Sequence, residues 1–276
     1  MQLYAKLQLI TDQMLARITI LLFFFLSIPC WSIGQKNENS SEEKTEKKKV
    51  KILGDKMFNF DILAGIDFPQ ADMAKRFGTS YRLGLGIKYK TAGNWIFGVK
   101  GELILGNRMR EDSLLINMKT SQGGVISQLG DVLNVGTFER GYLLGVQVGR
   151  IFPVFQVNKN SGLTSVFSAG FMQHKIKLFD KDNSFPQFRD SYYKGYDRLT
   201  NGGYIENYTG YTYHATNKLI NISVGVDAVW GFTRGRRDYL YDVARKDDKK
   251  RNDVLIGFKL GWIVPIYKKL AEETYY

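Results

Sequence analysis

The 276-residue chain contains one cysteine, Cys30, and two histidines, His174 and His214. It has no CxxC or HExxH motif, and the adjacent Asp247 and Asp248 lack the spacing of a calcium-binding loop. The glycine-rich segments GLGIK and GGVISQLG are not placed between a strand and a helix, so they do not predict a phosphate-binding loop. We therefore expect neither a metal nor a cofactor.

The sequence also lacks an apolar run of about twenty residues, the length that a membrane-spanning helix needs. Its longest run, ITILLFFFLSI, follows Arg17 and precedes a small-residue segment. This pattern predicts a secretory signal peptide over residues 1–34. Cys30 lies inside it, so the mature chain would contain no cysteine, which suits an oxidising envelope compartment.

Residues 35–55 are almost wholly polar and carry dense charge of both signs. Such a segment cannot bury enough apolar area to offset the entropy of ordering, so we expect a disordered, charged periplasmic leader. A short tether that contacts the cell wall or a partner subunit is the alternative.

Apolar residues at every second position mark eight segments between residues 56 and 267. In the last segment Val254, Phe258 and Trp262 share one face and Lys259 lies on the other, a period of two that indicates a strand. A strand that crosses a bilayer obliquely needs about nine to eleven residues, whereas most strands of soluble proteins have about five or six. The sequence therefore predicts an all-β fold, an eight-stranded antiparallel transmembrane β-barrel over residues 56–267.

Two of the eight segments are less regular. The alternation of Phe167 and Phe171 changes phase before Ile176, which suggests a bulge or the end of the membrane-embedded part. The sixth segment, residues 204–215, has aromatic residues on both faces, so its register stays open.

The connections between the segments alternate in length. Short ones fall at residues 91–94, 158–162 and 216–218, and long ones at 69–80, 107–132, 179–203 and 234–253. Bacterial outer-membrane barrels have short periplasmic turns and long external loops. Both ends of the barrel domain should therefore face the periplasm, with residues 268–276 as a short periplasmic tail.

The segments DMAKRFGTSYRLGLGIKYK and NWIFGVKGELILGN, and the closing LGWIVPIY, resemble small eight-stranded outer-membrane barrels. The resemblance is to the OmpA/OmpX-like class, particularly an uncharacterised branch in Bacteroidota, and it covers roughly residues 55–267. It implies an integral outer-membrane protein of a Gram-negative envelope, exported by its signal peptide. A role as a subunit of an envelope or secretion machine, such as a type 9 secretion component, would fit this class.

Eight strands enclose an interior only wide enough for side chains to fill. The alternation places charges of both signs inside: Asp61, Asp67, Glu102, Glu139 and Asp227 with Arg82, Lys88, Lys100 and Lys259. We expect them to form a hydrogen-bonded, salt-bridged plug. A proton or ion path is the alternative.

An enzyme would need a base beside a nucleophile, and the candidates are His174 and His214 with Ser168 and Glu206. The two histidines fall near opposite ends of their predicted strands, so they could not share a substrate. We therefore expect a non-enzymatic barrel with a structural or interaction role. A barrel enzyme that modifies lipid A is the alternative.

The predicted external loops carry two further sets of residues. With a net charge of +12 and a signal peptide, the chain is expected to meet lipopolysaccharide phosphates and not nucleic acid. The candidate lipopolysaccharide contacts are Arg234, Arg236, Arg237, Lys249, Lys250 and Arg251, and a merely solvated loop is the alternative. The candidate contacts for other envelope proteins are Phe185, Phe188, Tyr192, Tyr193 and Tyr196. The alternative is that these rings pack onto the barrel rim.

Overall fold

The computed structural model describes residues 54–122, 124–126, 130–133, 135–154, 158–179, 192–215 and 221–266. The predicted signal peptide, nearly all of the charged leader and the tail lie outside these residues. Within them, no helix is both long enough and apolar enough to span a membrane.

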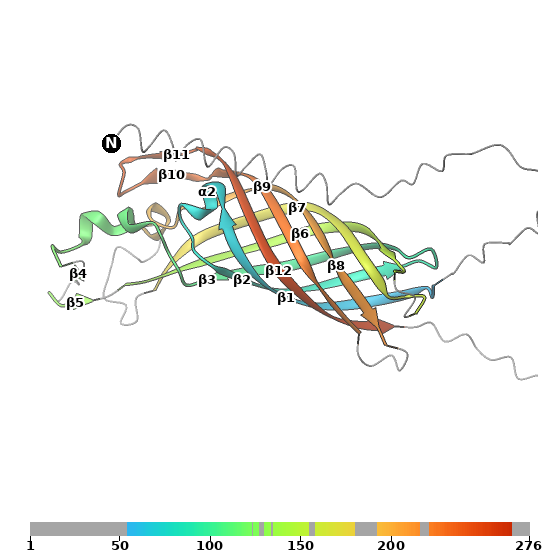
Figure 1. Ribbon diagram of the computed structural model, residues 1–276. Coiled ribbons are helices and arrows are strands. Elements are labelled where there is room, and N and C mark those ends of the chain that lie inside the picture. The colour runs from blue at the N-terminus through green and yellow to red at the C-terminus, as the bar shows by residue number, and fades with distance from the viewer. Residues whose placement is uncertain are drawn as a thin grey trace, which may run out of the picture.

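Eight long strands close into one antiparallel barrel (Figure 1), which confirms the predicted fold class. Around the barrel the order is β1, β12, β9, β8, β7, β6, β3 and β2, and each strand pairs with its neighbours in this series. The barrel closes because β1 pairs with β2 on one side and with β12, the last strand in the sequence, on the other. The strands are β1 (Met57–Gln70), β2 (Ser80–Lys90), β3 (Trp95–Gly106), β6 (Gly136–Phe152), β7 (Gly162–Phe179), β8 (Thr200–His214), β9 (Asn221–Gly235) and β12 (Lys250–Ile266).

The pairing register sets the stagger of the barrel. A path that begins at Leu260 and passes from paired residue to paired residue through all eight strands returns to β12 at Lys250, ten residues away. Strands in a barrel with this stagger tilt against its axis, and the interior of an eight-stranded barrel holds side chains and no wide channel.

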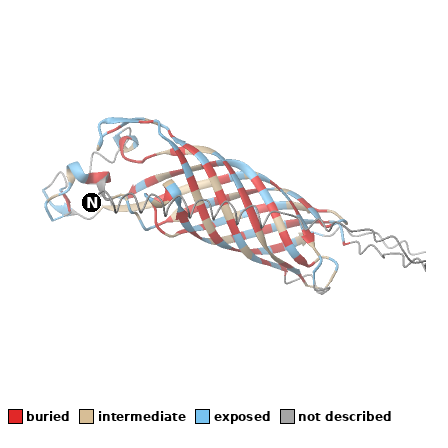
Figure 2. Cartoon of the chain, turned by 45° about the horizontal axis from the view of Figure 1, so that its top comes forward, coloured by how far each residue is buried: buried red, intermediate tan, exposed pale blue. Residues whose placement is uncertain are grey.

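Alternation along the strands is clear in the burial pattern (Figure 2). On β12, Phe258 is 64% exposed and Leu260 is 52% exposed, whereas Lys259 between them is 6% exposed. β1 repeats the pattern, with Phe58, Ile62 and Phe68 exposed. An apolar outer face around a polar inner face is the reverse of a soluble sandwich, and it is what a lipid-facing barrel requires.

The strand pairing gives the register of the two segments that are less regular in sequence, β7 and β8. The strands contain no bulge before Ile176, because β6 and β7 pair without interruption from the pair Gly136 and Phe179 to the pair Phe152 and Leu163. The apparent phase change arises because Ile176 and Leu178 point inward, where apolar side chains from the loops cover the inner face. On β8, Tyr204, Glu206 and Tyr208 point inward.

The long connections all lie at one end of the barrel, here called the long-loop end, and the short turns lie at the other, the short-turn end (Figure 1). The elements of the long-loop end are α2 (Ala71–Ala74), η1 (Asp112–Met118), β4 (Val125–Ile126), β5 (Val132–Leu133), η3 (Tyr192–Gly195), β10 (Arg237–Leu240) and β11 (Arg245–Asp247). The last predicted loop, residues 234–253, begins too early and ends too late, because β9 runs to Gly235 and β12 begins at Lys250. Arg234, Lys250 and Arg251 are therefore strand residues.

Two interior glycines leave room for the side chains of Tyr204 and Tyr208. A Cβ on Gly145 would lie 2.4 Å from the Tyr204 hydroxyl oxygen, and one on Gly225 would lie 2.4 Å from the Thr209 carbonyl oxygen and 2.9 Å from the Tyr208 ring. Although Gly225 faces the interior, a serine there would collide with backbone. Interior glycines are thus part of the packing and not spare volume.

Candidate functional site

The middle of the barrel interior is crossed by a network of buried ion pairs. Arg82 donates from Nε and Nη2 to both carboxylate oxygens of Asp67, at 2.6 and 2.7 Å. The same guanidinium donates to Glu102 at 3.1 Å and to Asp227 at 2.5 Å. Arg82 comes from β2 and Asp227 from β9, so one side chain joins strands on different sides of the barrel.

Two lysines extend the network toward the short-turn end. Lys259 lies 2.7 Å from both Glu102 and Glu206 and 3.2 Å from Asp227. Lys100 pairs with Glu206 and lies 3.4 Å from Glu102. Of the lumenal charges expected from the sequence, Asp67, Arg82, Lys100, Glu102, Asp227 and Lys259 meet in this network, and Glu206 joins them. Asp61 and Lys88 form a separate pair at 2.5 Å, and Glu139 accepts a hydrogen bond from the Ser80 hydroxyl. Glu206 was considered only as a companion of a histidine, because the register of its strand was open.

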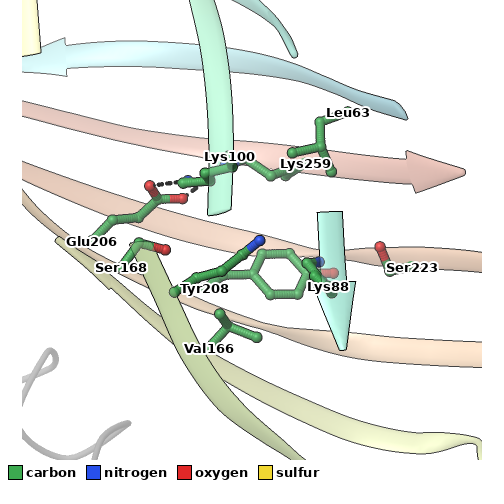
Figure 3. Close-up of a pocket in the computed structure, with 10 residues that line it drawn as sticks. Leu63, Lys88, Lys100, Val166, Ser168, Glu206, Tyr208, Ser223 and Lys259 are labelled. Atoms are coloured by element: carbon green, nitrogen blue, oxygen red, sulfur yellow. Dashed lines mark hydrogen bonds and ion pairs between the residues drawn. The ribbon is translucent and has the colours of Figure 1, made fainter. Parts of the chain in front are cut away.

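A small cavity lies beside this network (Figure 3). Its volume is about 20 Å³, and its lining includes Ser168, Glu206, Tyr208 and Lys259. A cavity needs about 10 to 15 Å³ of such volume to hold one water molecule. The space therefore accommodates a water beside the charges, and it is far smaller than the several hundred Å³ of a typical ligand pocket.

Between the ion pairs and the long-loop end the interior holds an apolar cluster together with the buried polar group of His174, Thr233 and Asp253. Leu143 and Met172 come from the strands, and Met73 and Phe77 come from the segment that contains α2. All four are 0% exposed. The α2 segment thus covers the barrel mouth and places an apolar layer above the charged one.

The predicted catalytic candidates are separated. Ser168 pairs with Glu206 in the register, but His174 pairs with Thr200, and His214 lies at the other end of β8 beside Asn221. His174 is buried, with Nε2 2.8 Å from the Asp253 carboxylate. The histidines therefore lie at opposite ends as expected, and neither is beside Ser168. No cluster of metal-ligating side chains occurs among the described residues.

Ion pairs connect the loops at the rim of the long-loop end. Arg76, which follows α2, lies 3.4 Å from Glu111 and 3.7 Å from Asp247, and donates to the Thr200 hydroxyl at 3.2 Å. Burial, with the charge of Arg251 nearby, lowers the pKa of Arg76 from its usual value. Four separate segments thus meet at one buried cation.

Two of the six basic residues proposed to contact lipopolysaccharide bind carboxylates of this chain, and the other four are exposed. Arg237 donates to both carboxylate oxygens of Asp197, at 2.7 and 2.5 Å, and this hydrogen bonding raises its pKa. Arg251 is 9% exposed and donates to Asp247 at 2.6 Å. The other members are exposed: Arg234, Arg236, Lys249 and Lys250. The positions of Arg237 on β10 and Arg251 on β12 bring their guanidinium groups to the carboxylates of Asp197 and Asp247.

Three of the predicted partner-contact tyrosines are placed, and Phe185 and Phe188 lie outside the described residues. Tyr193 donates to the Ile176 carbonyl at 2.9 Å, and burial together with the charge of nearby Asp197 raises its pKa to about 12. Tyr196 is 9% exposed. Tyr192 is 58% exposed and lies 5.8 Å from the ring of Tyr241. Tyr193 and Tyr196 therefore pack onto the rim, and Tyr192 stays accessible.

Outward-facing cations form an arc on the barrel wall near the long-loop end. Its members, which we call the basic arc, are the strand residues Arg140, Lys175, Lys177, Arg234 and Lys250, with Arg236 directly after the end of β9. Arg234 and Arg236 also line a hollow of about 240 Å³ with Lys246, Asp238 and Asp248. Sequence reasoning missed Arg140, Lys175 and Lys177 because the alternation was not followed beyond the apolar parts of β6 and β7.

These features define a small β-barrel with a lipid-facing outer surface and a charged interior. No protein-family model matches the sequence, and no curated protein is significantly similar to it. Several solved structures are similar in fold, and they are small outer-membrane barrels, as the sequence resemblance implied. None of them bears on the Bacteroidota branch, which stays a prediction.

Neisserial surface protein A is 11% identical with a TM-score of 0.42, and the match covers 75% of this chain and 96% of that one. Ail, the attachment invasion locus protein of Yersinia pestis, is 8% identical with a TM-score of 0.38, covering 76% and 99%. The outer membrane protein AlkL is 9% identical with a TM-score of 0.35, covering 85% and 100%. At these values the likeness concerns the fold alone.

Proposed function

We propose that this chain is a non-enzymatic, integral outer-membrane barrel with a lumen closed to ions. Its role is structural or interactive, through the loops of the long-loop end. The main support for a closed lumen is the buried network of ion pairs around Arg82 and Lys259. The cavity beside this network has a volume of only about 20 Å³. Contacts with other proteins of an envelope or secretion machine would use exposed loop side chains such as Tyr192.

The outer surface supports the membrane placement. Apolar side chains face outward on all eight strands, as in the exposed Phe60, Leu83 and Val146. Aromatic pairs border this belt, with Trp95 and Phe97 at the short-turn end and Trp230 and Phe232 toward the long-loop end. Aromatic girdles are typical of both interfaces of outer-membrane barrels, whose long loops face outward. The long-loop end is accordingly assigned to the cell surface.

The layered interior supports the closed lumen. An ion that crossed it would have to pass the apolar layer at Leu143 and Met172 and then separate Arg82 from its carboxylates. Carboxylates and cations that satisfy one another in a desolvated space resist such separation, because an unpaired buried charge is costly.

Protein extracted from carbonate-washed outer membranes and reconstituted into planar bilayers should therefore show no stable single-channel conductance. The reason is that the buried ion pairs of Arg82 and the apolar layer above them occupy the interior of this narrow barrel. Brief irregular currents at the level of protein-free detergent controls are compatible with this result. Reproducible steps of one amplitude, obtained from folded protein, would contradict the closed lumen.

The basic arc favours a second function, binding of lipopolysaccharide phosphate. Because the register advances ten residues over eight strands, Arg140, Lys175 and Arg234 lie about seven to nine residues beyond the level of Leu260. With a rise of about 3.3 Å per residue and a tilt of about 40°, this is roughly 17 to 22 Å from the mid-plane. The apolar band of such barrels is about 25 Å tall, so these cations reach the head groups.

Replacing Arg234, Arg236 and Lys250 together with glutamine should reduce the lipopolysaccharide that co-purifies with the barrel. All three are exposed, and arginine is suited to bidentate phosphate contacts. The affinity should fall with salt, because exposed charges are screened over about 8 to 10 Å at physiological ionic strength. Native mass spectrometry of bound lipid, at two salt concentrations, measures the effect.

A matched triple change of Lys56, Lys75 and Arg245 to glutamine is the control, because it removes the same charge from exposed positions outside the arc. It should leave the bound lipid nearly unchanged. Equal loss in both triple variants would mean that net charge, and not the arc, attracts the lipid.

A further inference from the structure

The outer face of the connection between β9 and β12 carries charges of both signs. Arg234, Arg236 and Asp238 follow one another at every second residue, and Lys246 and Asp248 do the same where the chain returns. All five are exposed and line the hollow of about 240 Å³ at the rim, which we call the charged hollow. The period of two thus continues beyond the barrel wall and places cations and carboxylates on one face.

The two arginines of the charged hollow are held through Nε. Arg234 Nε donates to the backbone carbonyl of Asp248 at 2.9 Å, and Arg236 Nε donates to Asn201 Oδ1 at 2.6 Å. Within the part of the chain that the structure describes, the terminal Nη groups of these two side chains donate no hydrogen bond. A guanidinium fixed in this way keeps its outer N–H groups for a bidentate contact with phosphate.

The carboxylates of the hollow are only loosely paired. Arg234 Nη2 lies 3.7 Å from the Asp248 carboxylate, and Lys246 Nζ lies 4.0 Å from that of Asp238. The four side chains are about half exposed or more, and such exposed pairs contribute little to stability. A ligand that offers better partners can therefore separate both pairs at small cost.

From this arrangement we propose that the charged hollow binds a phosphoethanolamine group carried by a membrane lipid. Its three cations suit the phosphate, and its two carboxylates suit a primary ammonium, which has three N–H donors. A group with negative charge alone would face both carboxylates unfavourably. The inference deepens and rests on the proposed binding of lipopolysaccharide phosphate at the basic arc, which shares Arg234 and Arg236 with the hollow.

The order of the charges along the chain matches the order of groups in such a lipid. Arg234 lies on the barrel wall near the end of β9, at the level of the head groups, whereas Asp238 lies on β10 in the long-loop end. In a lipid with this head group the phosphate is attached to the apolar part and the ammonium is farther from it. Tails against the apolar belt would therefore place the phosphate at Arg234 and the ammonium toward Asp238.

Competition between two lipids tests this ligand class. The whole protein, purified from outer membranes, is incubated with equal amounts of phosphatidylethanolamine and phosphatidylglycerol that have the same acyl chains. Native mass spectrometry gives the ratio of the two bound lipids. Asp238→Asn combined with Asp248→Asn should lower this ratio about threefold or more, because the ammonium loses both carboxylates whereas a head group without an amine loses only their repulsion.

Lipopolysaccharide is the second possible source of the group. Preparations with and without phosphoethanolamine are compared in the same way, again as a ratio of the two bound lipids. A fall of either ratio in the double variant supports the proposal, and the ratio that falls identifies the lipid.

Asp55→Asn combined with Asp131→Asn is the matched control, because both residues are exposed and lie outside the hollow. It changes the net charge by the same amount and should leave both ratios as in the wild type. Heat-modifiable migration on gels reports the fold of each variant. All four substitutions are at exposed positions, so the barrel should form in both double variants.

Unchanged ratios for both lipid pairs in the folded hollow variant, or an equal fall in the control variant, would overturn the phosphoethanolamine assignment. Neither result would touch the proposed phosphate binding, which depends on the lipopolysaccharide lost when Arg234, Arg236 and Lys250 are replaced. If that triple variant keeps its lipopolysaccharide, the proposed phosphate binding is wrong, whatever the two ratios show.

Discussion

Methionine in place of Arg82 should lower the free energy of unfolding of the barrel by about 3 to 5 kcal/mol, the usual cost of removing one partner from a buried ion pair. Arg82 is 1% exposed and contacts Asp67, Glu102 and Asp227. Methionine fills similar space but leaves these carboxylates short of one cation. Reversible urea unfolding of the folded barrel in lipid vesicles, followed by tryptophan fluorescence, measures the loss.

Lys75→Met is the matched control. Lys75 also forms an ion pair, 2.7 Å from Asp72, but its side chain is 72% exposed, and exposed pairs contribute about 0 to 1 kcal/mol. If Arg82→Met costs no more than Lys75→Met, water must solvate the interior charges. The closed lumen proposed here would then be wrong.

The period-two pattern was sufficient to predict the fold and most of the lumenal charges. On β1, β2 and β12 the alternation is long and unbroken, so the inward positions of Asp67, Arg82 and Lys259 followed directly. What the pattern could not supply is which of these charges meet. Arg82 and Asp227 are 145 residues apart, and only the strand register brings them together.

The parts that sequence reasoning missed depend on register or on loop packing. Glu206 lies on a strand with aromatic residues on both faces, so hydrophobicity alone does not choose its direction. Arg237 and Arg251 seemed free because their partners, Asp197 and Asp247, belong to loops whose hairpin and turn geometry set the contacts. Charge clusters in a sequence therefore show where cations occur but not which are already paired.

Gly225 shows that the sequence pattern also does not reveal how much space surrounds an inward-facing residue. Alternation along the strand places Gly225 inward, and from alternation alone a serine there would be tolerated. The structure leaves no such room, because the strand pairs so closely with β8 that a Cβ on Gly225 would meet the Thr209 carbonyl oxygen. Steric room depends on the neighbouring strand and on Tyr208, and neither distance can be read from alternation.

Arginine in place of Leu260 should destabilise the barrel by about 2 to 4 kcal/mol and impair its assembly, because a charge at the bilayer mid-plane has that cost in outer-membrane barrels. Leu260 is 52% exposed on the outer wall of β12, and its paired neighbours Val224 and Ala64 also face outward. The measurements are the free energy of unfolding in lipid vesicles and the amount of heat-modifiable protein in the outer membrane.

Ile266→Arg makes the same change on the same face of β12, but at the short-turn end, where the belt meets the head groups. Its cost should be only about 0 to 1 kcal/mol, since the penalty falls toward the interface. The difference between the two losses in unfolding free energy measures the effect of depth in the bilayer, because both variants introduce the same arginine. Equal costs would mean that Leu260 does not face the middle of a membrane, and the assignment of the outer wall to lipid would fail with it.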